Sequence, residues 1–138
     1  MEFFSCELTC QSQLIDFPSE HVRWLDLQED WPAIAAHYQR LGVTITQADF
    51  PVNQWKLCAW VEDGEICSMA GVMFMTIQNW EIGAVSTHSL YFGRGYAKAV
   101  CAFAARYILV HGKRVTCNTA ADNLPMRRVM QAIGMMSQ

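Results

Sequence analysis

The order of strand-like and helix-like runs in residues 79–120 restricts the possible folds more than any other part of the chain does. A strand-like run, "NWEIGAVST", is followed by two glycines one residue apart, Gly93 and Gly95, and then by an alanine-rich apolar run over residues 96–111. A second strand-like run, "RVTCNTA", follows Gly112. Strand, helix and strand in this order form a right-handed crossover between parallel strands. The sequence therefore predicts a βαβ unit with a glycine turn at the start of its helix.

The residues before this unit indicate an antiparallel arrangement. Two β-rich runs over residues 54–77 are joined at Asp63-Gly64, which is a strong hairpin signal. A helix is expected between Asp30, as its N-cap, and Gly42. A last helix with an apolar stripe is expected from residue 122 or 123 to residue 134, and "EFFSCELT" near the start reads as a short strand.

Size and charge limit the kind of protein. The 138 residues, 52% of them apolar and 17% charged, suit a single domain over residues 1–138. A formal charge of −3 without a clustered basic face argues against a nucleic-acid partner. The longest apolar segment, residues 96–110, is interrupted by Lys98 and Arg106 and is too short to span a bilayer. We therefore expect no membrane partner.

The six cysteines are expected to be reduced thiols. The first residues, "MEFFSCELTC", lack the pattern of a secretory signal, so a cytoplasmic location is expected. No two cysteines have the spacing of a zinc site, and no metal is expected. Four of them, Cys58, Cys67, Cys101 and Cys117, lie in apolar runs and are predicted to belong to the core.

The glycine pair suits a phosphate. At a strand-to-helix turn, the free N–H groups and the positive end of the helix dipole face one point. Gly93 and Gly95 would allow backbone to approach a diphosphate, and Arg94 between them could add charge. A dinucleotide fold would need a third glycine where Lys98 stands, and a Walker loop would need Gly-Lys-Ser/Thr, which is absent. A simple tight turn is the alternative reading.

With these residues in view, the chain resembles the GNAT acyltransferases, which use acetyl-coenzyme A. The resemblance covers roughly residues 55–135, from "WKLCAWVEDGEI" through "WEIGAVSTHSLYFGRGYAKAV" to "AADNLPMRRVMQAIGM". The matching positions are Glu81, Ile82, Gly83, Val85, Thr87, Gly93, Gly95, Tyr96, Ala97, Asp122, Asn123, Pro125 and Gly134. It implies an α/β (α+β) fold whose mixed, mostly antiparallel sheet has helices on both faces.

The resemblance also implies which residues hold the cofactor. The pantetheine arm would lie along the backbone of Val85, Ser86 and Thr87, and Asn123 would touch the cofactor from the last helix. The diphosphate would be held at Gly93, Arg94, Gly95, Tyr96 and Ala97.

Two side chains are candidates for catalysis. Glu81 stands where the family often places a carboxylate that removes the amine proton, so it is the candidate general base; a solvent-facing strand carboxylate is the alternative. His88 follows the proposed cofactor groove, and a histidine's ordinary pKa of about 6.5 suits proton transfer. Its alternative is a loop histidine that hydrogen-bonds the backbone. A backbone N–H near Val85 would polarise the thioester carbonyl.

The sequence departs from the family pattern at three places. Leu90 and Phe92 replace polar or cationic groups near the phosphates, and Met130 stands where the family commonly has a proton-donating tyrosine. Only four residues follow Gly134, so we expect the family's last strands to be truncated. The strand "RVTCNTA" would then be an exposed edge, from which we predict a homodimer.

The resulting hypothesis is an acetyl-coenzyme A-dependent N-acetyltransferase acting on a primary amine of a small molecule or peptide. A non-catalytic acyl-coenzyme A-binding module is the main alternative, which the missing tyrosine favours. An unrelated α/β domain with a plain glycine turn is the third.

Overall fold

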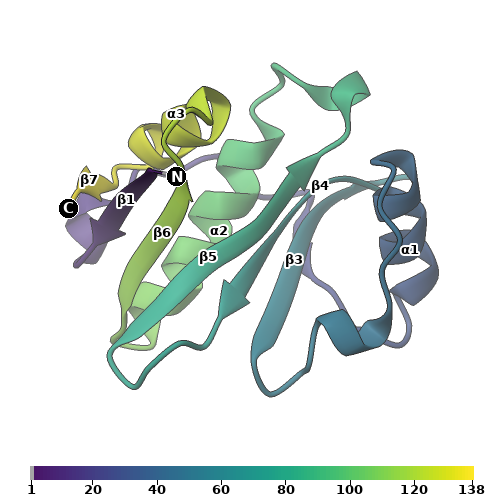
Figure 1. The fold of residues 1–138 in the computed structure, drawn as a ribbon, viewed down its shortest axis with the longest axis horizontal. Coiled ribbons are helices and arrows are strands. Elements are labelled where there is room, and N and C mark those ends of the chain that lie inside the picture. The colour runs from purple at the N-terminus through teal and green to yellow at the C-terminus, as the bar shows by residue number, and fades with distance from the viewer. Residues whose placement is uncertain (1) are drawn as a thin grey trace.

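Within residues 2–138, which the computed structural model describes, the chain forms a seven-stranded sheet in the order β2-β3-β4-β5-β6-β1-β7 (Figure 1). The strands are β1 (Phe3–Leu8), β2 (Val22–Trp24), β3 (Trp55–Glu62), β4 (Glu65–Met73), β5 (Asn79–Thr87), β6 (Arg114–Ala120) and β7 (Met136–Ser137). The α-helices are α1 (Trp31–Arg40), α2 (Tyr96–Val110) and α3 (Leu124–Ala132). Short 3-10 helices, η1 (Gln11–Gln13), η2 (Gln47–Asp49) and η3 (Ser89–Tyr91), lie in the connections.

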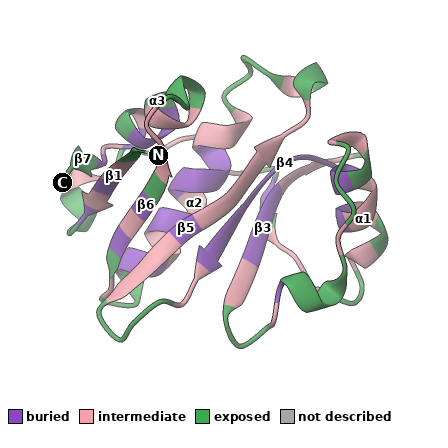
Figure 2. Ribbon diagram, in the orientation of Figure 1, coloured by how far each residue is buried: buried purple, intermediate pink, exposed green. Residues whose placement is uncertain are grey.

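Helices cover both faces of the sheet, as expected. One face packs on α2 and α3, where buried residues such as Val72, Ile108 and Met130 form a single apolar cluster. The other face carries a smaller cluster beneath α1 that includes Ile34 and Met69. Figure 2 shows the buried residues concentrated along the central strands and the sides of the helices that face them.

The sheet is mixed and mostly antiparallel. The β3–β4 hairpin turns at Asp63 and Gly64, whose φ angles are +51° and +75°, as a two-residue hairpin turn with positive φ requires. Strands β5 and β6 are parallel, with α2 as their crossover. The predicted elements over residues 30–134 are thus confirmed, because strong turn signals bound each of them.

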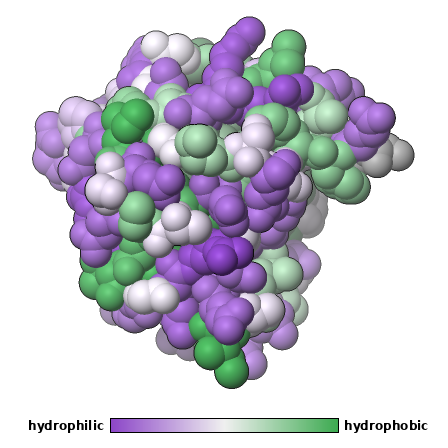
Figure 3. All heavy atoms as spheres, turned by 90° about the vertical axis from the view of Figure 1, so that its left-hand side faces the viewer, coloured by the Kyte–Doolittle hydropathy of each residue, from purple (hydrophilic) through white to green (hydrophobic). Residues whose placement is uncertain are grey.

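The prediction that β6 is an exposed edge is wrong. Strand β1 pairs with it antiparallel, from Phe3 opposite Ala120 to Leu8 opposite Val115, and β7 pairs with β1 in turn. This removes the reason for expecting a homodimer through β6. The side of the molecule that carries β1, β7 and α3 is mainly hydrophilic, with apolar side chains scattered among polar ones (Figure 3).

The four cysteines that were predicted to belong to the core are buried, as expected. All six cysteines are free; Cys10 is exposed, and the other five are buried. Among the residues that the structure describes, no helix is long and apolar enough to cross a membrane.

Candidate active site

A cavity of about 780 Å³ opens where β5 and β6 separate. The two strands pair only at their beginnings, with Asn79, Trp80 and Glu81 opposite Arg114, Val115 and Thr116. The lining consists of residues 82–87 of β5, 117–119 of β6, 91–93 and 95–98 of the connection and α2, and Asn123, Pro125, Met126 and Val129 of α3. Because no strand fills the gap, backbone of β5 and β6 is available to a ligand there.

A β-bulge shapes the β5 wall of this cavity. Gly83 pairs with Gly71 and Ser86 pairs with Met69, so two residues of β5 stand opposite one residue of β4. One of the two, Ala84, has a φ of +51°. Such a bulge interrupts the ladder and re-aims backbone groups. The bulge therefore lies at the point where the resemblance places the N–H that polarises a thioester carbonyl.

The glycine pair lies at the cavity, at the first turn of α2. Gly93 and Gly95 have φ angles of +76° and +81°, and a Cβ at either would meet no atom within 4 Å. The first bond of α2 runs from the N–H of Ala99 to the carbonyl of Gly95 at 3.1 Å, which leaves the preceding N–H groups without helical partners. Open space beside free N–H groups and a helix N-terminus fits a diphosphate.

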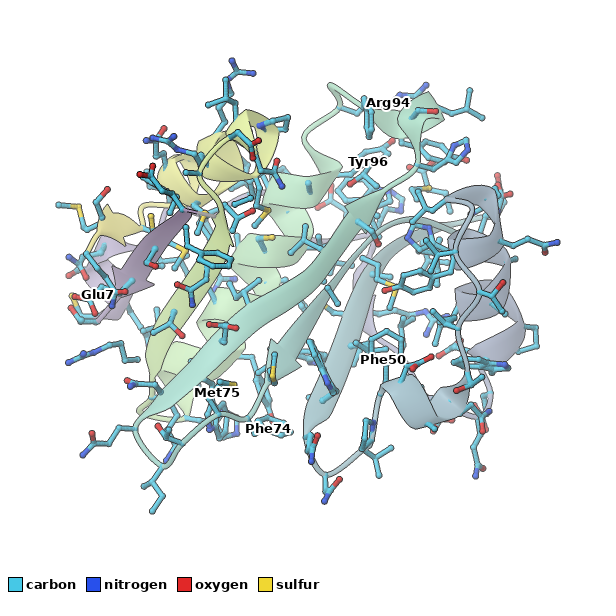
Figure 4. The ribbon with its side chains drawn as sticks, in the orientation of Figure 1. Glu7, Phe50, Phe74, Met75, Arg94 and Tyr96 are labelled. Carbon is cyan, nitrogen blue, oxygen red and sulfur yellow. The ribbon has the colours of Figure 1, made fainter. Side chains whose placement is uncertain are left out.

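Arg94, by contrast, does not line the cavity. Its guanidinium lies 5.4 Å from the centre of the Tyr91 ring. In Figure 4 it sits on the outer side of the glycine loop, above Tyr96. Phe92 does line the cavity and is exposed, as is Leu90 nearby. The loop thus offers backbone N–H groups more than cationic side chains.

Helix α3 closes the cavity on the side opposite β5. Asn123 caps this helix, because its Oδ1 accepts a hydrogen bond of 3.2 Å from the N–H of Met126. Its Nδ2 donates to Thr119 Oγ1 at 3.1 Å. Met130 is fully buried in the core and is not itself a lining residue, so the family's tyrosine position is here a packing position.

Glu81 lies just before the strands separate and does not line the cavity itself. Asn118, which does, donates a hydrogen bond of 2.6 Å from Nδ2 to Glu81 Oε1. The neighbouring thiol of Cys117 is inert, because burial and the charge of Glu81 raise its pKa to about 12. Glu81 is therefore a carboxylate held beside the cavity lining by Asn118, at the last β5–β6 pair.

His88 has a local structural contact. It caps η3, and its Nδ1 accepts a hydrogen bond of 3.3 Å from the N–H of Leu90. It does not line the cavity. This geometry agrees with the alternative reading of His88, a loop histidine bound to backbone.

Sequence reasoning missed two groups at the cavity. Asn118 and Thr119 face it because β6 bends away from β5, which no local pattern indicates. The second is His37 of α1, whose Nε2 lies 2.8 Å from the hydroxyl oxygen of Ser86, a residue that was predicted. These two residues are far apart in the sequence, and only the folded chain joins them.

The comparison with known families agrees with this geometry. The model of the acetyltransferase (GNAT) domain matches residues 3–136. This chain belongs to the GNAT acetyltransferase family. No curated protein matches it.

Solved structures show the same fold at low sequence identity. A GNAT-family acetyltransferase from Novosphingobium aromaticivorans superposes with a TM-score of 0.78 and 17% identity, over 100% of this chain and 62% of that one. Another, from Colwellia psychrerythraea, gives a TM-score of 0.77 and 14% identity, over 99% and 54%. This GNAT chain thus spans little more than half the length of these two structures.

A third structure contains a ligand. The AAC(6')-Iy enzyme, in complex with the bisubstrate analogue CoA-S-monomethyl-acetylneamine, superposes with a TM-score of 0.68 and 15% identity. The match covers 82% of this GNAT chain and 88% of that one.

Proposed function

We propose that this GNAT chain is an acetyl-coenzyme A-dependent N-acetyltransferase that transfers an acetyl group to a primary amine of a small molecule or peptide. The observation that carries the proposal is the cavity between β5 and β6, which ends at the glycine turn and the free N–H groups of α2. The cavity has β5 backbone along one wall and the free N–H groups of the glycine turn beside it. That arrangement suits a diphosphate joined to an extended arm.

Each wall of the cavity has a distinct role in this proposal. The N–H groups of residues 93–97 hold the diphosphate, and Asn123 contacts the cofactor from α3. Val85, Ser86 and Thr87 bind the arm through their backbone groups. Bound acetyl-coenzyme A supplies an activated acyl group. The bulge at Ala84 and Val85 provides an N–H that polarises the acyl carbonyl.

Glu81 is the proposed general base. It accepts the proton that an ammonium acceptor must lose before it can attack a carbonyl. Asn118 holds one carboxylate oxygen and leaves the other for the acceptor or a water molecule. His88 is proposed only as a loop-ordering residue, because its Nδ1 accepts from the N–H of Leu90 and the residue does not line the cavity.

The test has two stages, and each has its own outcome. Calorimetry with coenzyme A should show saturable binding; no heat and no thermal shift would refute cofactor binding. A thiol-release assay with acetyl-coenzyme A should then find an acceptor among small amines, peptides and aminoglycosides. Binding without release across the whole panel would support the non-catalytic module instead.

A further inference from the structure

A buried histidine supports one hydroxyl of the cavity wall. His37 is fully buried between α1 and the sheet, and its Nε2 lies 2.8 Å from Ser86 Oγ. Its Nδ1 has no hydrogen-bond partner. Ser86 itself lines the cavity. Because buried polar groups are costly unless they are paired, a histidine with a single partner, located at a binding cavity, calls for a functional explanation.

The ring is neutral and its hydrogen can be placed. Burial, and then the positive charge of Arg40, lower the pKa of His37 to about 4. A neutral ring carries one N–H, and a buried N–H without an acceptor is rarer and costlier than a buried bare nitrogen. The Ile66 carbonyl near this ring already accepts a 2.8 Å hydrogen bond from Arg40 Nη2. We therefore assign the hydrogen to Nε2, which then donates to Ser86 Oγ. The Ser86 hydroxyl hydrogen is then free to point into the cavity.

The other hydroxyls that line the cavity have hydrogen-bond partners other than histidine. Tyr91 donates to Glu65 at 3.3 Å, and Tyr96 donates to Glu62 at 3.2 Å. The Thr87 hydroxyl lies 2.8 Å from that of Ser68. Thr119 accepts from Asn123 and has no histidine behind it. Ser86 is thus the lining hydroxyl that lies against a buried histidine.

We propose that Ser86 donates its hydroxyl hydrogen to the sulfur of coenzyme A, and that His37 is the positioning residue that aims it. The inference rests on the acetyltransferase function proposed above. It gives the departing thiolate a proton source on the β5 wall, where Met130 of α3 supplies none.

The proposed step balances. The acceptor ammonium first loses one proton through Glu81 to solvent. Ser86 then gives its hydrogen to the sulfur as the bond between sulfur and acyl carbon breaks. The Ser86 oxygen takes the second hydrogen that nitrogen loses on bonding to that carbon. Ser86 and His37 end as they began, and one proton has gone to solvent and one to the thiol.

The experiment measures ionisation of the thiol of bound coenzyme A, by its thiolate absorbance as a function of pH, and needs no acceptor. A hydrogen bond to a charged group is worth roughly a tenfold change in an ionisation equilibrium. Ser86→Ala should therefore lower the thiolate fraction at a given pH about tenfold. His37→Phe should lower it in the same direction, and Ser86→Thr should restore it.

Thr116→Val is the control, since it removes a hydroxyl of the neighbouring strand β6 that does not line the cavity and donates to the Trp80 carbonyl; it should leave the thiolate fraction unchanged. If His37→Phe does not fold, Ser86→Ala and Ser86→Thr carry the test. Equal thiolate fractions in wild type and Ser86→Ala, with coenzyme A bound equally, would overturn the role of Ser86 alone. Failure of the wild type to bind coenzyme A would instead refute the proposed function.

Discussion

Asn118 Nδ2 donates a 2.6 Å hydrogen bond to Glu81 Oε1 across β5 and β6, immediately before these strands separate. The Asn118 Oδ1 also accepts a hydrogen bond from the Ser5 hydroxyl of β1. Three neighbouring strands thus share one chain of polar contacts, which fixes the carboxylate beside the cavity lining where β5 and β6 separate.

The first prediction concerns this carboxylate. Glu81→Gln keeps the size and one amide oxygen for Asn118 but removes the proton acceptor, so we expect turnover to fall about a hundredfold. Coenzyme A affinity, measured by calorimetry, should stay within about twofold because Glu81 does not line the cavity. Equal turnover in the two proteins would remove Glu81 from the mechanism.

The second prediction concerns the glycine turn. Gly95→Ala places a residue with a Cβ at a φ of +81°, which is strained, and the Cβ enters the open space assigned to the diphosphate. Gly42→Ala is matched to it, with a φ of +78° and equally open surroundings at the end of α1. Both should lose about 1–2 kcal/mol of unfolding free energy. Only Gly95→Ala should weaken coenzyme A binding, by tenfold or more; similar affinities would place the diphosphate elsewhere.

The third prediction concerns acid stability. The folded pKa of His37 is about 4, below its ordinary 6.5, so between these values the unfolded chain binds a proton that the folded chain does not. The stabilising contribution is complete above pH 6.5 and is lost as the pH falls to about 4, by about 3 kcal/mol.

Denaturant unfolding across this pH range would measure the effect. His37→Phe should flatten the pH dependence, whereas Ser86→Ala, which leaves the buried ring in place, should keep it. A His37→Phe protein whose stability falls as steeply as that of the wild type would show that other groups cause the loss.

The fourth prediction concerns the strand that completes the sheet. Leu8 is 1% exposed in β1, so Leu8→Ala should cost about 2–5 kcal/mol of unfolding free energy. Phe3 lies in the same strand but is 66% exposed, and Phe3→Ala should cost less than about 1 kcal/mol. Equal losses in thermal or denaturant unfolding would contradict the burial of β1 against the core.

Local signals predicted most of this fold. Asp63-Gly64, Gly95, Gly112 and Asn123 each mark an element boundary, and the structure puts a turn or a cap at each of them. The position of β1 could not be predicted this way, because the pairing of Phe3 with Ala120 is a contact between distant segments. The resemblance alone led to an exposed β6 and so to the wrong edge.

In the candidate site, too, the residues marked by local patterns were predicted and those placed by tertiary contacts were not. Of the nine residues predicted to bind the cofactor, all but Arg94 line the cavity. Their places follow from two strand-to-helix junctions, β5 to α2 for most of them and β6 to α3 for Asn123. Asn118 and His37 were not predicted as site residues, since each acts through a partner on another element, Glu81 and Ser86 respectively. A side chain defined by a tertiary contact leaves no periodic mark in the sequence.

The pairing of β1 with β6 also affects the order of folding. Phe3 meets Ala120 only after the intervening chain has collapsed, and joining such remote segments is slow. The β6 wall of the cavity gains its second neighbour at that late step. Coenzyme A binding should therefore appear last during refolding, after the hairpin and helix signals, and could serve as a reporter of complete assembly.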